Sequence, residues 1–224
     1  MAYLLNYAPD NASLCVRLAL LRLGVAFEAR LVDRGARGQK APAYLALNPN
    51  GLIPVLETPD GPMFETGAIL LWLADRHGCG LAPAPDHPDR ARVLPWLFWI
   101  ANTLHPALRV LFYPDQHVAG DAGPLVARTR ERVAAMLDTL EAVALAPWLG
   151  AERSFLLDCY LCPLLRWLAI YPRDGTAWFD LARWPDLLAV ARRMETRPEA
   201  LAEGLGATPF TRPRLAIPPE GSAT

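Results

Sequence analysis

A segment rich in glycine and proline, residues 78–88, divides the 224-residue chain into two unlike parts. Glycine and proline interrupt both helices and strands, so a cluster of them is typical of a connection between domains. We therefore expect a first domain over residues 1–78, a linker over 79–88 and a second domain over 89–206. The last residues, 207–224, contain four prolines, and we expect much of this tail to be extended or disordered.

The first part alternates between β-prone apolar runs and stretches in which apolar residues recur at helical spacing. Turn residues such as Gly24 and the segment 58–62 separate these runs. The expected strands and helices, in chain order, are 3–7, 13–23, 27–32, 42–47, 55–57, 63–64 and 66–77. Their order, βαβαββα, is that of a thioredoxin-like α/β domain.

The second part is predicted to be an all-α helical domain. Its apolar residues recur at helical spacing over 89–112, 124–145, 155–170 and 186–195. Pro163 lies inside the third of these segments and is expected to kink that helix or to move its boundary, because proline cannot donate a helical hydrogen bond.

Charge and hydropathy exclude several classes of partner. The formal net charge at pH 7 is −1, which gives no reason to expect nucleic acid, since that would require a basic face. The longest apolar stretches are interrupted or fall short of the ~20 residues that span a bilayer, and the chain begins with no secretory leader. We therefore expect a cytoplasmic protein that makes no use of a membrane.

The four cysteines show no disulfide-rich spacing, which fits a reducing compartment. Two of them, Cys159 and Cys162, form a C-x-x-C pair inside an apolar run late in the chain. No further cluster of cysteine or histidine supplies the other ligands of a zinc site, and a redox pair should open the first helix instead. We interpret both as buried core thiols and expect no metal cofactor.

Two motifs in the first part carry the functional argument. Ile53-Pro54 precedes a β-prone run, and Glu65-Thr66 precedes a helical run. Each has a purely structural explanation, because an ordinary trans proline can begin a strand and a threonine can cap a helix. A helix start also attracts an anion, and Glu65 beside it could hold an ammonium group, so the second motif could bind a zwitterion.

Taken together, the motifs within residues 48–57 and 64–69 resemble the glutathione-binding half of the cytosolic glutathione transferases. In that family an Ile-Pro or Val-Pro before an edge strand is followed by a Glu-Ser or Glu-Thr that opens a helix. The resemblance covers about residues 3–205 and looks closest to the bacterial beta-type branch, whose Trp-Leu-x-x-Ile-x-x-x-Leu-His segment is similar to residues 96–105. It implies a glutathione transferase fold, glutathione as co-substrate and a homodimer.

The resemblance also implies roles for individual residues. Pro54 is expected to be cis, and Ile53 to pair through its backbone with the cysteinyl part of glutathione like an added strand. Glu65 and the helix start at Thr66 would hold the ammonium and the α-carboxylate of the γ-glutamyl end. Lys40, before the second helix, would bind the glycyl carboxylate.

Such a transferase must supply a thiolate at neutral pH, although a free thiol with a pKa near 8.5 is only a few per cent ionised at pH 7. A hydroxyl hydrogen bond together with a helix N-terminus can lower that pKa. Ser13, at the start of the first helix, is the expected catalytic donor, although a plain helix cap is its simpler role. Tyr7, at the end of the first strand, is a second candidate donor.

The chain departs from the beta-type pattern where that branch has its cysteine. With Pro9, Ser13 and Leu14 in register with Pro-Gly-Ala-Cys-Ser-Leu, the cysteine falls on Ala12. Mixed-disulfide chemistry through this position is therefore excluded, which favours a serine-type conjugation mechanism. Cys15 could be a substitute thiol, but it lies two residues, about 200°, around the helix from Ser13 and is expected to point away.

A second departure concerns the helix expected over residues 155–170. Relatives commonly have Phe-Ser/Thr-x-x-Asp before this helix, as a capping box. Here Phe155 takes the place of the hydroxyl residue and would leave Asp158 without its reciprocal partner. The loss of such a cap costs about 1 kcal/mol.

His105 is the second expected catalytic residue. The matching histidine of beta-type relatives lies near the thiol and the electrophile, where it could polarise a substrate or act as acid or base. The alternative is a hydrogen-bonded histidine on the inner face of a long helix. The pocket for a small hydrophobic electrophile is expected to include Trp99, Asn102, His105, Phe112 and Tyr113.

Two functions remain open at this point. The first is a glutathione S-transferase in which Ser13 activates the thiol of glutathione for attack on a small hydrophobic electrophile, by conjugation, isomerisation, dehalogenation or reduction. The second is a glutathione-binding or protein-interaction module of the same fold with little turnover. The first predicts both binding and turnover of a general aromatic electrophile, and the second predicts binding alone.

Overall fold

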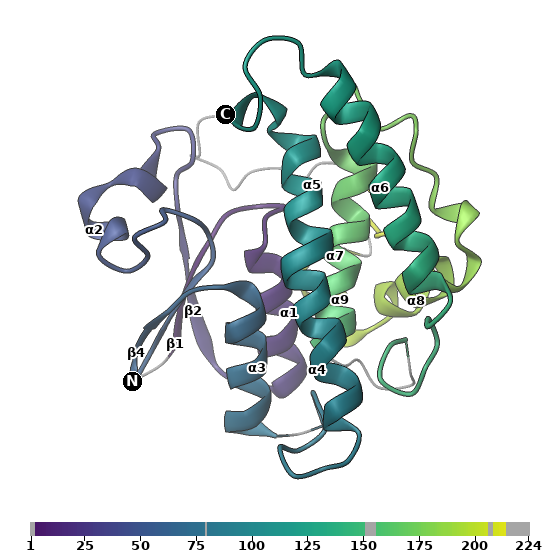
Figure 1. The fold of residues 1–224 in the computed structure, drawn as a ribbon. Helices are drawn as coiled ribbons and strands as arrows, with labels where there is room; N and C mark the ends of the chain where they lie inside the picture. The colour runs from purple at the N-terminus through teal and green to yellow at the C-terminus, as the bar shows by residue number, and fades with distance from the viewer. Residues whose placement is uncertain (1–2, 79, 151–155, 206–207, 214–224) are drawn as a thin grey trace.

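The computed structural model describes residues 3–78, 80–150, 156–205 and 208–213. A small sheet with its helices forms one side of the molecule, and a group of longer helices forms the other (Figure 1). Helix α1 (Ser13–Leu23) contacts both α3 (Thr66–His77) of the first side and α7 (Leu156–Ile170) of the second. One continuous apolar core therefore joins the two parts.

The sheet has four strands in the order β2-β1-β3-β4. Their bounds are Tyr3–Tyr7 for β1, Phe27–Leu31 for β2, Val55–Thr58 for β3 and Gly61–Met63 for β4. Strand β1 runs parallel to β2 and antiparallel to β3, and β3 pairs antiparallel with β4. With α1, α2 (Pro42–Leu45) and α3, the predicted βαβαββα order of a thioredoxin-like domain is confirmed.

Local chemistry explains where these elements stop. Helix α1 ends at Gly24, which has φ +66° and donates its N–H to the carbonyls of Leu20 and Leu21. Glycine adopts this left-handed conformation without the steric penalty of a side chain, so it is the usual residue beyond a helix end. The predicted end of this helix therefore agrees with the structure.

The second domain is helical throughout its described part, as predicted. Its α-helices are α4 (Arg90–Trp99), α5 (His105–Phe112), α6 (Gly123–Glu141), α7, α8 (Pro185–Glu195) and α9 (Pro198–Ala202). Helix α7 lies at the centre, and every one of its residues except Ala169 is buried. Because its sequence is apolar on all faces, it can only be stable when other helices surround it.

The helix predicted over residues 89–112 is not a single regular helix. Between α4 and α5 the backbone forms a π-helical segment, Ile100–Leu104. Pro106, the second residue of α5, follows this segment after His105; it has no N–H to give to the turn before it, and its ring would clash with a carbonyl of a regular α-helix. The wider π-turn accommodates this proline, and such segments are often found at functional sites.

Two predictions concern α7 and its cap. The helix continues through Pro163, so this proline does not set a boundary. Outside that capping box, Asp158 Oδ1 accepts a hydrogen bond of 2.6 Å from the backbone N–H of Gly150. Phe155 itself lies outside the described residues.

The described start of the tail is packed against the helical domain. The side chain of Phe210 is 1% exposed, and the backbone N–H of Thr211 donates to Glu195 Oε1 at 2.6 Å. Arg166 of α7 also donates to the carbonyl of Thr208. Apolar burial and hydrogen bonds therefore hold residues 208–213, while the rest of the tail lies outside the described residues.

Candidate functional site

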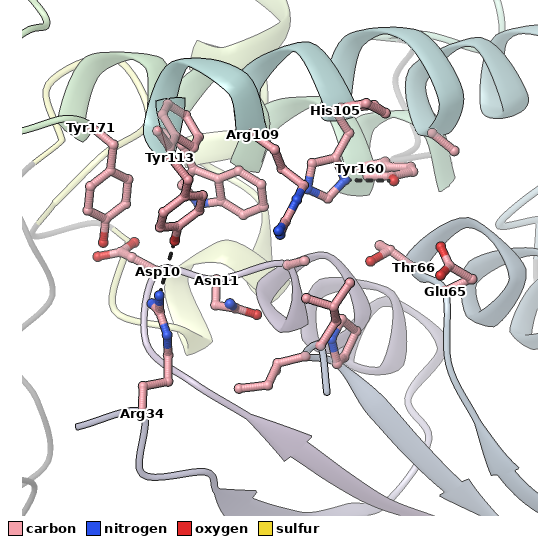
Figure 2. A pocket seen from close by; sticks show the side chains of 18 of the residues that line it. Asp10, Asn11, Arg34, Glu65, Thr66, His105, Arg109, Tyr113, Tyr160 and Tyr171 are labelled. Atoms are coloured by element: carbon pink, nitrogen blue, oxygen red, sulfur yellow. Dashed lines mark hydrogen bonds between the residues drawn. The ribbon is translucent and has the colours of Figure 1, made fainter. Parts of the chain in front are cut away.

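A cavity of about 510 Å³ lies between the two domains (Figure 2). Its floor comes from the β1–α1 turn, the segment before β3 and the start of α3, and its roof comes from α5 and α7. A smaller hollow of about 200 Å³ adjoins it and shares Asn11, Arg34, Ile53 and Arg109 with it. Both domains must therefore be present for the site to exist.

The peptide bond between Ile53 and Pro54 is cis, and both residues line the cavity. The loop before them is held from below by two side chains, since Tyr44 Oη and Asn48 Nδ2 both donate to the carbonyl of Leu52, at 3.0 and 2.8 Å. The expectation of a cis proline is confirmed. This backbone segment forms one edge of the cavity floor.

Glu65 and Thr66 line the cavity at the start of α3. Glu65 is the residue before the first turn of the helix and has φ +70° and ψ +112°. A residue with a side chain is rarely found with positive φ, and such strained conformations cluster at ligand sites. The start of the helix thus places a carboxylate and backbone amide groups side by side.

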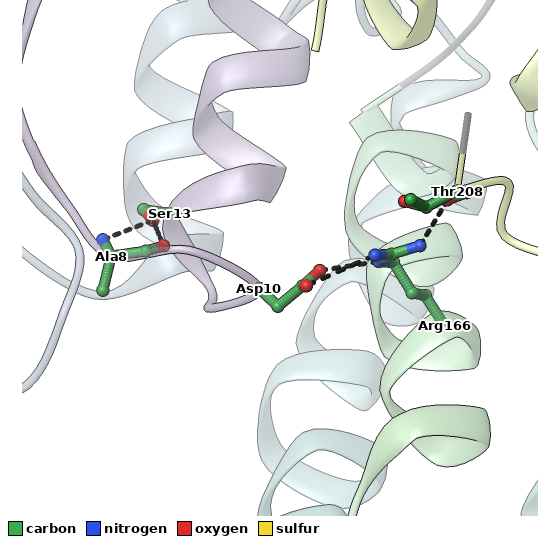
Figure 3. Close-up of polar contacts among 5 residues, drawn as sticks. All are labelled: Ala8, Asp10, Ser13, Arg166 and Thr208. Carbon is green, nitrogen blue, oxygen red and sulfur yellow. Dashed lines mark hydrogen bonds and ion pairs between the residues drawn. The ribbon is translucent and has the colours of Figure 1, made fainter. Parts of the chain in front are cut away.

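Ser13 begins α1 as predicted, but its side chain does not face the cavity. Its side chain is completely buried and is not part of the cavity lining. Its Oγ accepts from the backbone N–H of Ala8 at 3.2 Å and donates to the carbonyl of the same residue at 3.1 Å (Figure 3). The hydroxyl proton already has this acceptor, so the geometry does not support Ser13 as the donor to a thiol.

Ser13 is not a conventional helix cap either. It is the first residue of α1, and the residue at the cap position is Ala12, whose side chain makes no capping hydrogen bond. Its two bonds to Ala8 instead tie the end of β1 to the start of α1. The role that the structure assigns to this hydroxyl is to shape the turn between strand and helix.

Asn11 occupies the position in the cavity that was expected of Ser13. It lines both the cavity and the smaller hollow, beside Asp10 and Ala12. Its Oδ1 accepts from the backbone N–H of Ser13 at 3.3 Å, which fixes the orientation of the amide. Sequence reasoning missed Asn11, although its place in a turn directly before a helix was a usable signal.

The two other residues considered for the thiol chemistry, Cys15 and Tyr7, are also absent from the cavity lining. The Cys15 side chain is fully buried with Sγ 3.8 Å from the carbonyl of Tyr160, and burial raises its pKa well above the usual range. The ring of Tyr7 packs under the guanidinium of Arg17, 4.9 Å from its centroid. The prediction that Cys15 points away from the site is confirmed, and Cys159 and Cys162 are buried core thiols as predicted.

His105 does reach the cavity. Its Nδ1 lies 3.0 Å from the hydroxyl of Tyr160, which also lines the cavity (Figure 2). Burial, and then the positive charge of Arg109, lower the pKa of His105 to about 4. Burial raises the pKa of Tyr160 above its ordinary value. At neutral pH the pair therefore consists of a neutral imidazole and a protonated phenol.

The roof of the cavity differs in part from the expected pocket. His105, Phe112 and Tyr113 line it as predicted, whereas Trp99 and Asn102 do not. The π-helical segment precedes α5, and residues of α7 and of the loop after it fill the wall instead. The additional roof residues include Arg109, Tyr160, Trp167, Tyr171 and Arg173, and Ala101 of the π-helical segment also lines the cavity.

Lys40 lies at the edge of the smaller hollow, with its Nζ 3.0 Å from the carbonyl of Asn50. Arg34 lies on the same side and donates through Nη2 to the hydroxyl of Tyr113 at 3.0 Å (Figure 2). Two cations from the first domain therefore border this end of the site. An anionic group of a ligand would be stabilised there.

Comparison with known proteins decides the family. The model of the glutathione S-transferase N-terminal domain matches residues 12–76. The chain is 34% identical to the maleylacetoacetate isomerase of Rhizobium meliloti strain 1021, over 85% of this chain and 89% of that protein. It is 30% identical to glutathione S-transferase GstA of Escherichia coli O157:H7, over 90% of this chain and 98% of that protein. The chain belongs to the glutathione S-transferase family.

A solved structure agrees with this assignment. The glutathione S-transferase of a sphingomonad, complexed with glutathione, superposes with a TM-score of 0.74 at 32% identity, covering 91% of this chain and 98% of that one. The glutathione transferase fold expected from the sequence is thereby confirmed. In this family member, the segment Ile53-Pro54 and the start of α3 meet in one cavity, as the family pattern implies.

Two classes of feature are absent from the described part of the chain. Residues 3–78, 80–150, 156–205 and 208–213 contain no group of three or more histidine, cysteine or acidic side chains that could hold a metal ion. In the same ranges no helix combines the length and the apolar character that a bilayer crossing requires.

Proposed function

We propose that this enzyme binds glutathione in the interdomain cavity and transfers its thiolate to a small electrophile. The observation that carries the proposal is the meeting of three elements in one cavity. These are the backbone beside cis-Pro54, the strained start of α3 at Glu65, and the Asp10–Ala12 turn. Glutathione, a tripeptide with two carboxylates, one ammonium group and one thiol, has a group that is complementary to each of these three elements.

Glutathione would lie along the floor of the cavity. Its γ-glutamyl ammonium would contact the carboxylate of Glu65, and its α-carboxylate would accept from the amides at Thr66, where the helix dipole favours an anion. The cysteinyl backbone would pair with Ile53. The glycyl carboxylate would reach Lys40 at the smaller hollow.

Asn11 is the residue that we propose as hydrogen-bond donor to the thiolate. Its Oδ1 already accepts from the N–H of Ser13, so its Nδ2 is the part of the amide left to donate. A donor next to the start of α1 stabilises a thiolate by a charge-assisted bond and by the helix dipole. Ser13 would act through the shape of the turn, by its bonds to Ala8.

His105 would act on the electrophile as a neutral donor. Because the Tyr160 hydroxyl stays protonated, it can donate to Nδ1 and leave the imidazole proton on Nε2. An Nε2–H group can polarise a carbonyl, a nitro group or a leaving atom of the second substrate. With a pKa near 4, His105 would not serve as the main base at neutral pH.

The test compares two asparagine variants. Asn11→Ala should raise the pKa of the bound glutathione thiol, measured by the ultraviolet absorbance of the thiolate, and lower conjugation at pH 7 roughly tenfold. Asn102→Ala is the matched control, since Asn102 is exposed and outside the cavity lining. An unchanged thiol pKa in Asn11→Ala would remove Asn11 from the mechanism.

A second candidate function is a glutathione-binding module with little turnover. The burial of Ser13 supports this alternative, because the hydroxyl expected to activate the thiol does not face the cavity. Titration calorimetry with glutathione and a conjugation assay with a general aromatic electrophile separate the two. Heat of glutathione binding without turnover would support the module.

We further propose a cytoplasmic homodimer, to be checked by sedimentation. Phe98 of α4, which is 55% exposed, is a candidate contact between subunits.

A further inference from the structure

We infer that the electrophile of this transferase carries a carboxylate or a similar anionic group, which Arg109 binds. The inference rests on the proposed function, because it concerns the second substrate of the same cavity. It changes the expected substrate class from a purely hydrophobic molecule to an aromatic or unsaturated acid.

The first observation is the position of Arg109. It lies on α5 one helical turn after His105, so both side chains project from the same face of the helix. Figure 2 shows the guanidinium group directed from the roof into the cavity. Its positive charge also contributes to the low pKa of His105. A substrate group on Arg109 would therefore lie close to His105.

The second observation is that Arg109 makes no hydrogen bond or ion pair within the described part of the chain. Its guanidinium makes a cation–π contact with Tyr113, with Cζ 5.6 Å from the ring centroid. The other arginines nearby are used differently. Arg34 donates to the Tyr113 hydroxyl, and the buried Arg166 pairs with Asp10. The donors of Arg109 therefore face the cavity ready for a ligand.

The third observation is the balance of charge around the site. The cavity and the smaller hollow are lined by four basic side chains, Arg34, Lys40, Arg109 and Arg173, and by two acidic ones, Asp10 and Glu65. Asp10 lies against the guanidinium of Arg166, and Glu65 stands at the far end, at the start of α3. An excess of positive charge therefore remains at the roof, and Arg109 and Arg173 contribute it.

Glutathione would not account for this excess on its own. In the proposed arrangement its α-carboxylate lies at the start of α3 and its glycyl carboxylate at Lys40, both on the first domain. Arg109 comes from the opposite wall; it borders the smaller hollow and also faces the cavity together with the rings of Phe112 and Trp167. Those rings suit the apolar body of a substrate, and a half-buried guanidinium beside them suits a carboxylate, which it can bind through two parallel hydrogen bonds.

The test uses two electrophiles that differ in a single group, a chloronitrobenzoate and the matching chloronitrobenzamide. In both reactions the thiolate of glutathione forms a C–S bond, the C–Cl bond breaks, and chloride leaves with the electron pair. The benzoate and the benzamide differ in intrinsic reactivity, so the rate with each compound is compared between the unmodified enzyme and the variants. Arg109→Gln should lower kcat/KM roughly ten- to hundredfold for the benzoate and less than about threefold for the benzamide.

Controls exclude a general loss of structure. Arg109→Lys keeps the charge and should retain part of the preference for the benzoate. Arg128→Gln removes an exposed arginine of α6, whose side chain is 78% exposed, and should leave both reactions unchanged. Titration calorimetry of the two S-aryl conjugates of glutathione gives the same comparison without turnover, with the acid conjugate losing more affinity than the amide in Arg109→Gln.

Equal losses for acid and amide in Arg109→Gln, together with weaker binding of glutathione alone, would overturn the inference and assign Arg109 to glutathione itself. No loss for either compound would also overturn it. In both cases the proposed transferase function would stand. Absence of glutathione binding to the unmodified protein would instead refute the proposed function, and the inference would fall with it.

Discussion

Arg166 Nε lies 2.6 Å from Asp10 Oδ1, although the two residues are 156 positions apart in the sequence (Figure 3). Neither side chain is exposed by more than 5%. Asp10 belongs to the turn that carries Asn11 into the cavity and has φ +42°, while Arg166 belongs to the central helix α7. The ion pair therefore joins the turn below the cavity to the core of the helical domain.

This pair gives the first prediction. Arg166→Met and Asp10→Asn should each lower the free energy of unfolding by about 3–5 kcal/mol, because each leaves one buried group without its counter-charge. The double variant should lose less than the sum of the two, with a coupling of at least about 1 kcal/mol in chemical denaturation. Arg128→Met is the control: its ion pair with Glu131 is exposed, and its loss should cost less than about 1 kcal/mol. Strictly additive losses would contradict a direct interaction.

Ser13→Ala tests the corrected role of the serine. The change removes both hydrogen bonds to the Ala8 backbone and leaves that buried amide without its partner, so stability should fall by about 1–3 kcal/mol. The pKa of bound glutathione should stay close to that of the unmodified enzyme, measured by thiolate absorbance. A rise of that pKa comparable to the one expected for Asn11→Ala would show that Ser13 does contact the thiol.

His105 predicts a dependence of stability on pH. Its folded-state pKa, about 4, lies below the ordinary value of about 6.5, so the unfolded chain binds the proton more readily. The contribution is therefore present above about pH 6.5 and is lost as the pH falls toward 4. Between pH 7 and pH 5 the unmodified protein should lose up to about 2 kcal/mol from this group.

His105→Gln is the matching variant, because it keeps an acceptor for the Tyr160 hydroxyl and does not titrate in this range. The difference in unfolding free energy between pH 7 and pH 5, measured by denaturation at each pH, should be smaller in the variant. An identical difference in both proteins would show that His105 is not buried in its neutral form.

Gly51 and Gly120 provide a matched pair for the Lys40 end of the site. Both have positive φ, +58° and +84°, so an alanine is strained at either position. A Cβ at Gly51 would also lie 2.7 Å from the Gln39 carbonyl and 2.8 Å from Lys40 Nζ, whereas nothing lies within 4 Å at Gly120.

Gly51→Ala should therefore lose about 1–2 kcal/mol more stability than Gly120→Ala. It should also weaken the binding of glutathione in calorimetry, because Lys40 has to move, whereas Gly120→Ala should bind normally. Normal glutathione affinity in Gly51→Ala would remove Lys40 from the binding site.

Local patterns predicted the elements of the first domain because each of them depends on neighbours in the sequence. The period of apolar residues and the turn residues between them determine where strands and helices lie, and Gly24 stops α1 by its own conformational freedom. Ile53-Pro54 and Glu65-Thr66 were recognisable for the same reason: the chemistry of each motif is carried by adjacent residues.

The orientation of Ser13 was not predictable in this way. A serine at a helix start can cap the helix, face a ligand or bond back to the preceding strand, and the three differ only in how the turn closes. Here Asp10 of the turn forms an ion pair with Arg166, and Asn11 rather than Ser13 lines the cavity. That outcome depends on a helix far along the chain.

The sequence by itself determined the family, the βαβαββα order, the helical second domain and the two motifs of the cavity floor, since these depend on short-range spacing. Only the tertiary structure decided the roof of the site and its charge. Tyr160, Arg109 and Trp167 meet His105 and Asn11 because α7 packs against α1 and α3 of the first domain and α5 packs against α7. Close packing of distant helices, and the ion pairs it buries, are properties of the folded whole that no local pattern encodes.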